Sequence, residues 1–345
     1  MPAEAIPLAT ASQPSPRLRR HRRWLWLLLL GSAAYAQVCQ SAAEMEASER
    51  SALETTAKRY FDLSARGDIS ALKLDSILPV ASSFGGIEAA IKANQSAFNG
   101  AKAAVRPPFL LIADGPEPLA RAEFLCGVFG KLGQTKDSAV FVLPNLPPGK
   151  YGVIILDVNG GSEPRTLTLV VQQIGNDWKL AGFYATSARA AGHDAAWFMQ
   201  SARDFKTKSQ NHNAWLYFRE AVALSAPVDF MSTQATDKLY DEIQATQPAD
   251  VPLNGNSVDL SAAGKVYHWT EIFPLAVGAD LDVVVKYQAG DVSDSARSFR
   301  ENAAVIKALL MKFPELRDAF SGVVARAVDP SGRDYGTLMA MKDIK

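Results

Sequence analysis

Residues 150–184 read KYGVIILDVNGGSEPRTLTLVVQQIGNDWKLAGFY and contain three runs rich in β-branched and aromatic residues. Such runs are typical of β-strands, and we predict strands over 150–158, 166–174 and 177–184. The two breaks between the runs are Asn-Gly-Gly and Gly-Asn-Asp, which favour turns. Because short turns join consecutive strands, this segment predicts an antiparallel meander.

The same strand pattern extends toward the N-terminus, and helical spacing replaces it further upstream. Additional strands are predicted over 107–113, 119–129 and 138–143. Before them, apolar residues recur at helical spacing over 44–66 and 87–98. Helices that precede an antiparallel sheet in this way predict the α+β class.

The last predicted strands, with a turn and Trp178 at the start of the final one, resemble the end of nuclear-transport-factor-2-like domains. With the preceding helices, the resemblance covers residues 44–185. It implies a cone-shaped domain in which a curved sheet wraps helices around a pocket, and it implies no particular activity. By this analogy Tyr60 and Asp62 are candidates for the pocket, although Tyr60 also lies on the apolar stripe of its helix and suits core packing.

His193 is a third candidate for the pocket, because it lies just beyond this domain and precedes Asp194. A His–Asp pair can act as a general base. Asp194 also stands directly before a predicted helix, and the alternative role of a helix N-cap accounts for it fully. We therefore assign no catalytic residue.

Residues 193–245 are predicted to be helical, and they carry small and aromatic residues at characteristic positions: Phe198, Ala202, Phe205, Ala214, Phe218, Ala221 and Leu224. This spacing resembles one tetratricopeptide repeat, in which small residues let two antiparallel helices approach closely. Since such repeats generally need about three copies for stability, a plain helical hairpin packed on a neighbouring domain is the alternative. Trp197, Trp215 and Tyr217 are candidates for an exposed contact with a partner protein.

The remaining sequence predicts a linker and a second domain. Residues 246–263 are rich in Pro, Asn, Gly and Ser, which are typical of a linker. A smaller α+β domain is expected over 264–345. Its predicted elements are strands at 265–273 and 281–288, a helix at 296–320, and strands at 321–328 and 335–343.

Residues 1–36 predict export. A basic cluster at 17–23 precedes the apolar run 24–30, and a cleavage site formed by Ala34 and Ala36 follows. Basic, apolar and small residues in this order are typical of a secretory signal peptide. The alternative is an N-terminal anchor in the inner membrane, but a membrane span needs about 20 apolar residues and this run is shorter. We therefore expect a periplasmic or secreted protein that meets the membrane only during export.

The charge of the chain argues against nucleic acid as a partner. The chain has 36 basic and 36 acidic residues, and its first 36 positions contain five Arg and one Glu. The mature chain therefore has 31 basic and 35 acidic residues, which gives a formal charge of −4. Nucleic-acid binding calls for a clustered basic face, and here the basic cluster belongs to the signal peptide.

The mature chain has two cysteines, Cys39 and Cys126. An oxidising compartment permits a disulfide between them. Cys126, however, shares one face of a predicted strand with apolar residues, and Cys39 lies in a segment that we expect to be frayed. We predict two free thiols, because burial would hide one partner from the other.

The sequence lacks the common fingerprints of cofactor and catalytic sites. The glycine-rich dinucleotide and phosphate loops, the zincin histidine pair and the serine-hydrolase elbow are absent, and no two mature histidines are spaced as a metal pair. We predict no metal and no cofactor. The leading interpretation is an exported, non-enzymatic protein that binds an unknown protein or small molecule. The alternatives are a pocket enzyme of the cone-shaped fold, either an isomerase or a hydrolase, and a structural partner in a cell-envelope complex.

We predict that the mature protein begins at Gln37, because signal peptidase reads the small residues Ala34 and Ala36. Mass spectrometry of the exported protein should give this N-terminus. A full-length chain retained in the membrane would contradict cleavage and favour the anchor.

Overall fold

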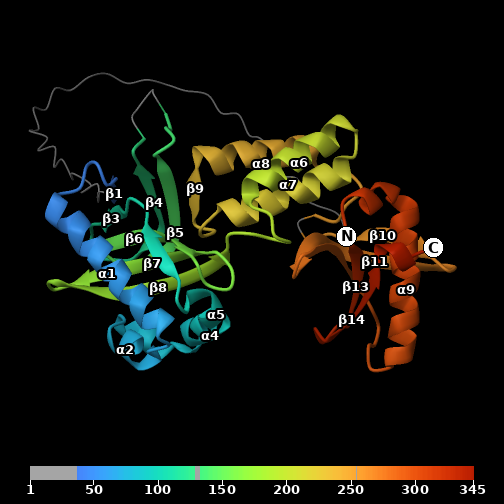
Figure 1. Cartoon of the computed structure of the whole chain (residues 1–345), viewed down its shortest axis with the longest axis horizontal. Coiled ribbons are helices and arrows are strands. Elements are labelled where there is room, and N and C mark those ends of the chain that lie inside the picture. The colour runs from blue at the N-terminus through green and yellow to red at the C-terminus, as the bar shows by residue number, and fades with distance from the viewer. Residues whose placement is uncertain (1–36, 129–132, 254) are drawn as a thin grey trace, which may run out of the picture. The chain divides into compact units, whose positions relative to one another are not determined.

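A computed structural model describes residues 37–128, 133–253 and 255–345, and Figure 1 shows their helices and strands. The sheets are mainly antiparallel, with helices packed on them, and the predicted α+β class is confirmed. The predicted signal peptide, including Ala34 and Ala36, lies outside the described residues. Within them, no helix combines the length and the apolar character needed to cross a membrane.

The first sheet is built around the meander expected from residues 150–184. Its strands are, in spatial order, β1 (Gln37–Gln40), β3 (Phe109–Ala113), β6 (Gly149–Asn159), β7 (Arg165–Ile174) and β8 (Asp177–Ser187), and β2 (Lys102–Val105) also pairs with β6. All of these pairs are antiparallel. The last three strands follow one another in sequence and in space, as short turns require.

A second sheet takes up the other strands of this region. It has three strands, β4 (Leu119–Cys126), β5 (Ala139–Leu146) and β9 (Met231–Thr233). The consecutive strands therefore do not form one continuous meander. Phe124 and Phe141 of the second sheet share a hydrophobic core with Val153 and Ile155 of β6, so the second sheet packs across the first instead of extending it.

β6 is buried on both faces because its side chains alternate between two cores. Val153 and Ile155 belong to the core shared with the second sheet, whereas Ile154 and Leu156 belong to a core shared with helices. The helices of this region are α1 (Ala47–Ala65), α2 (Ile69–Leu74), α3 (Leu78–Ser82), α4 (Gly85–Ala93) and α5 (Gln95–Phe98). Burial on both faces explains why β6 reads as an almost continuous apolar run.

Cys39 and Cys126 form a disulfide, so the prediction of two free thiols is wrong. Their Cα atoms are 5.0 Å apart, a separation that a disulfide can bridge. The segment around Cys39 is not frayed, because it forms β1 and pairs with β3, which places Cys39 opposite Leu111. Strand pairing therefore brings Cys39 next to the buried Cys126, and the bridge joins β1 of the first sheet to β4 of the second.

The helical region contains α6 (Ala195–Thr207), α7 (Asn211–Ser225) and, after β9, α8 (Gln234–Thr246). Asp194 is the N-cap of α6, because its carboxylate accepts a hydrogen bond of 3.0 Å from the backbone N–H of Trp197. Ala202 and Ala214 are fully buried between packed helices. Small side chains at these positions let α6 and α7 approach closely.

The third sheet has five strands that follow the sequence order, and Figure 1 shows α9 beside them. Its elements are β10 (Val258–Ala262), β11 (Lys265–Val277), β12 (Asp280–Gln288), α9 (Ser295–Lys312), β13 (Gly322–Val328) and β14 (Asp334–Ala340). β12 and β13 are parallel, since the helix α9 connects them by a crossover, and the other pairs are antiparallel.

Two elements of this region differ from the sequence prediction. β10 lies within the segment that was expected to be a linker, where it pairs with the start of β11. The long helix ends at Lys312 instead of near residue 320, and a 3₁₀ helix spans Pro314–Asp318. The residue before a proline avoids the helical conformation, so Pro314 explains why α9 stops.

The helical hairpin packs on the C-terminal sheet, and the two share one hydrophobic core. The Tyr217 hydroxyl donates a hydrogen bond of 2.6 Å to the carbonyl oxygen of Ala319. The Asn213 side-chain amide donates another of 2.6 Å to the carbonyl oxygen of Glu315. These bonds satisfy backbone acceptors in the turn that follows α9, so α7 completes the end of the C-terminal domain.

Replacing both Cys39 and Cys126 by Ala should lower the free energy of unfolding by about 2–5 kcal/mol, because the bridge connects residues 87 positions apart and restricts the unfolded chain. Denaturant-induced unfolding of the parent and the double variant measures the difference. Reductant should shift the parent to the midpoint of the double variant and leave the variant unchanged. Identical midpoints for the oxidised parent and the variant would contradict the bridge.

Candidate functional site

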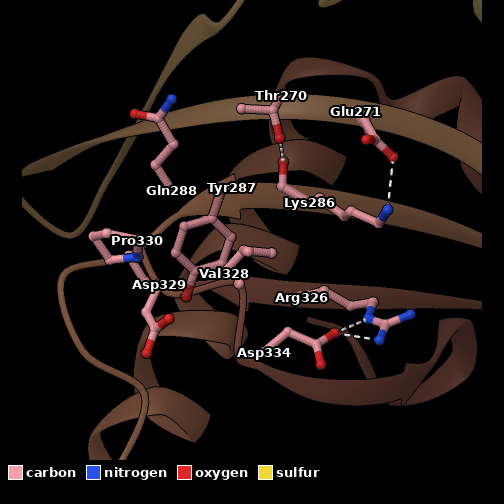
Figure 2. Close-up of a pocket in the computed structure, with 12 residues that line it drawn as sticks. Thr270, Glu271, Lys286, Tyr287, Gln288, Arg326, Val328, Asp329, Pro330 and Asp334 are labelled. Atoms are coloured by element: carbon pink, nitrogen blue, oxygen red, sulfur yellow. Dashed lines mark hydrogen bonds and ion pairs between the residues drawn. The ribbon is translucent and has the colours of Figure 1, made fainter. Parts of the chain in front are cut away.

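A groove with a volume of about 720 Å³ lies on the C-terminal sheet. Its lining comes from β11, β12, β13 and the loop that leads to β14, and Figure 2 shows these side chains. Gln288 and Val328 place the groove at the carboxyl ends of the two parallel strands. In open α/β sheets, ligands usually bind at this end of parallel strands.

The alternation of side chains along β12 gives the sheet a covered face and an open face. Val283 and Val285 belong to the core that includes α9. Asp282, Val284 and Lys286 lie on the opposite side, because successive side chains of a strand point to opposite faces. We call the side of the sheet that carries these three residues the open face.

Four charged side chains form a row across the open face, as Figure 2 shows. Glu271, Lys286 and Arg326 stand opposite one another, and Asp334 lies diagonally from Arg326, opposite Val328. Lys286 is opposite Arg326 in the parallel register of β12 and β13, and opposite Glu271 in the antiparallel register of β11 and β12. Lys286 Nζ is 2.8 Å from Glu271 Oε2. Arg326 Nε donates a hydrogen bond of 2.5 Å to Asp334 Oδ2. The row therefore has two cations at its centre and one carboxylate at each end.

This row is suited to an anionic group. Neighbouring strands are about 4.8 Å apart, so Lys286 and Arg326 can contact the same carboxylate or phosphate. Their side chains are 28% and 41% exposed, respectively, so both cationic ends reach solvent. Like charges directly opposite each other on a sheet are unfavourable, and a bound anion would relieve their repulsion.

Local hydrogen bonds fix the conformation of the chain at the two sides of the groove. On β11, the register shifts between Trp269 and Glu271, and the Thr270 hydroxyl in this bulge donates a hydrogen bond of 3.4 Å to the carbonyl oxygen of Lys286. Bulges are common beside functional sites because they redirect side chains. At the other side, the side-chain hydrogen bond from Ser331, together with bonds from Arg333, lowers the pKa of Asp329 to about 2.

Neither Lys286 nor Arg326 belongs to a motif that can be recognised in the sequence. Alternation along β12 indicates which of its side chains share a face. The neighbour across the sheet depends on a crossover through α9, and the sequence does not fix which residue of β13 meets Lys286. The cation pair is therefore a product of tertiary register.

The pocket candidates predicted near the first domain have different surroundings from one another. Tyr60 is fully buried, whereas Asp62 is exposed on the same helix. His193 is exposed and stacks on Trp197, with ring centroids 3.7 Å apart and ring planes 11° apart. Asp194 is engaged as a helix cap.

Tyr60 is part of a polar cluster that ties α1 to β8. Its hydroxyl is 3.0 Å from Asp75 Oδ2, from the Asp75 carbonyl oxygen and from the Trp178 carbonyl oxygen. Burial and the nearby Asp75 carboxylate raise the pKa of Tyr60. Burial by itself would raise the pKa of Asp75, but hydrogen bonds from Lys179, Arg59 and Tyr60 hold that pKa below its ordinary value. Because its hydroxyl is already engaged by these protein partners, Tyr60 has a structural role.

The three aromatic residues predicted to meet a partner are divided between surface and core. Trp197 is 40% exposed. Trp215 and Tyr217 are buried in the core that α7 shares with the C-terminal sheet. Only Trp197, already covered on one side by His193, offers an aromatic surface at this position.

Comparison with known proteins assigns no class to this chain. No protein-family model, curated protein or solved structure matches it. The resemblances to nuclear-transport-factor-2-like domains and to the tetratricopeptide repeat therefore stay predictions. In the part of the chain that the structure describes, no group of three His, Cys, Asp or Glu side chains is placed to hold a metal ion.

Tyr60→Phe should lower the free energy of unfolding by about 1–3 kcal/mol, because it leaves the buried acceptors at Asp75 and Trp178 without their donor. Asp62→Asn should change it by less than about 0.5 kcal/mol, because Asp62 is exposed. Denaturant-induced unfolding at neutral pH compares the two. Equal effects would contradict the structural role of Tyr60.

Proposed function

We propose that the protein is an exported, non-enzymatic binding protein whose C-terminal groove recognises an anionic group. The observation that carries this proposal is the row in which Lys286 and Arg326 are neighbours on the open face. Both are oriented by carboxylates, Lys286 by Glu271 and Arg326 by Asp334. Cations that are held in place before the ligand arrives lose less conformational entropy on binding.

The groove's hydroxyl groups support binding over catalysis. Thr270 uses its hydroxyl to bond the Lys286 carbonyl oxygen. The Tyr287 hydroxyl donates a hydrogen bond of 2.8 Å to Asn302, on the α9 side of the sheet. Covalent catalysis needs a nucleophile beside a base that activates it, and these hydroxyl groups serve the fold instead.

The disulfide between Cys39 and Cys126 supports export. Disulfides persist in oxidising compartments and are rare in the reducing cytosol. The proposal therefore combines the predicted signal peptide with a periplasmic or secreted site of action. The mature N-terminus predicted at Gln37 lies only two residues before Cys39, so cleavage would leave β1 intact.

Titration with inorganic phosphate and with acetate, followed by ¹H–¹⁵N NMR, tests the anion site. At matched ionic strength, the amide signals of Lys286 and Arg326 should shift and saturate with a Kd in roughly the millimolar range, as expected for one small charged group. The double variant Lys286→Gln/Arg326→Gln should bind at least about tenfold more weakly, because it loses two charge-assisted contacts.

A matched control variant loses two positive charges at a site outside the groove. Arg300→Gln/Lys307→Gln removes two exposed cations from α9, which packs on the covered side of the sheet. This variant should bind both anions as the parent does. The proposal would be overturned if the anions left the amide signals of the groove unchanged. It would also be overturned if the same changes in amide signals persisted in the Lys286→Gln/Arg326→Gln variant.

A further inference from the structure

Asp282 is a buried carboxylate on the open face, and it makes no hydrogen bond or ion pair with any residue that the structure describes. It is 3% exposed. Gly322 stands opposite it on β13, and a side chain there would come within 2.8 Å of Asp282 Oδ1. The absence of a side chain at Gly322 therefore makes room for the carboxylate.

Although Asp282 is only 3% exposed, its carboxylate oxygens are not completely shielded from solvent. In the described part of the chain, the side-chain nitrogen and oxygen atoms that are buried without a partner belong to Arg165, Asn213 and Trp269. The oxygens of Asp282 are not among them, so they keep some contact with solvent. A buried carboxylate needs a donor, and here a ligand could supply one.

The open face has three rows with different chemistry. The first row contains the cations Lys286 and Arg326. The second row is apolar and crosses the sheet through Phe273, Val284, Val324 and Leu338. The third row contains Asp282. Asp280 lies two residues before it, on the same side of β12. Leu338 is 56% exposed and Val284 is 1% exposed, so a ligand can reach the apolar row from its β14 edge but not at Val284 itself.

The spacing of the rows sets the length of a ligand that could meet both charged ends. Asp282 and Lys286 are four residues apart on one strand, which corresponds to about 13 Å. An extended peptide advances about 3.3–3.6 Å per residue, so about four residues span this distance. A peptide with free termini also carries a cation at one end and an anion at the other.

We infer that the open face binds a short extended peptide with free termini, whose ammonium group meets Asp282 and whose carboxylate meets Lys286 and Arg326. This inference rests on the proposed function, since it takes the same cation pair as the anion site. The apolar row between the charged ends favours apolar side chains in the middle of the peptide. The occupant is thus a peptide of about four residues aligned with β12.

The electrostatics of the acidic end agree with an ammonium ligand. Burial, and then the nearby charge of Asp280, raise the pKa of Asp282. An ammonium group would stabilise the ionised carboxylate against both effects. Both charged ends of the peptide would then be paired, as desolvated charges require.

Four peptides and the parent protein provide the first test. The probe is the tetrapeptide alanyl-valyl-valyl-alanine with free termini, and its relatives are the N-acetylated, the C-amidated and the doubly blocked forms. Calorimetry or NMR titration at neutral pH and low salt should show about tenfold weaker binding for each single block, because each removes one charge-assisted contact. These comparisons need no substitution in the protein.

Two variants locate the contacts. Asp282→Asn keeps the size of the side chain, and it should abolish the difference between free and N-acetylated peptide while keeping the difference between free and C-amidated peptide. Lys286→Gln/Arg326→Gln should do the reverse. Circular dichroism and unfolding midpoints check that both variants are folded, and the Arg300→Gln/Lys307→Gln variant should match the parent with all four peptides.

The outcomes separate this inference from the anion site. If C-amidation weakens binding and N-acetylation does not, the anion site stands and the peptide assignment is wrong. If neither block matters, the peptide assignment fails, and the phosphate and acetate titrations decide separately whether the anion site stands. If N-acetylation still weakens binding to the Asp282→Asn variant, the ammonium group lies elsewhere and the inference is overturned.

Discussion

The parallel pairing of β12 with β13 determines which side chains are neighbours on the open face. In this register Lys286 stands beside Arg326, Val284 beside Val324 and Asp282 beside Gly322. A slip of one residue would bring side chains of the covered face to the open face. The register is specified because the covered face of both strands is packed into the core with α9.

Two neighbouring cations are unfavourable unless their charge is offset. Glu271 and Asp334 offset it from β11 and β14, at the two ends of the row. The carboxylates hold the cations without lying between them, so the centre of the row remains available to an anion. The same sheet thus combines a conventional hydrophobic core on one side with a patterned polar and apolar surface on the other.

The N-terminal region is organised around β6, whose two faces belong to different cores. The disulfide adds a covalent link between the two sheets of this region. The hairpin of α6 and α7 shares a hydrophobic core with the C-terminal sheet, and α7 donates side-chain hydrogen bonds to the backbone carbonyls of Glu315 and Ala319. Since these carbonyls follow α9, the hairpin supports the helix that covers the far side of the binding sheet.

Local patterns in the sequence predicted the parts of the fold that depend on nearby residues. The strands of the meander, the α+β class and the position of Asp194 before a helix follow from alternation, turn residues and caps. The predictions that failed required long-range pairing: Cys39 was expected in a frayed tail because nothing local shows that β1 pairs with β3. Lys286 and Arg326 were missed for the same reason, since their contact depends on a crossover and a register.

A crystal structure of the mature protein with alanyl-valyl-valyl-alanine would show directly whether the open face holds the peptide. We expect density for an extended peptide on the open face, with its carboxylate within hydrogen-bond distance of Lys286 Nζ and the Arg326 guanidinium. Peptide bound at another surface, with the row of Glu271, Lys286, Arg326 and Asp334 unchanged and in contact only with solvent, would contradict it.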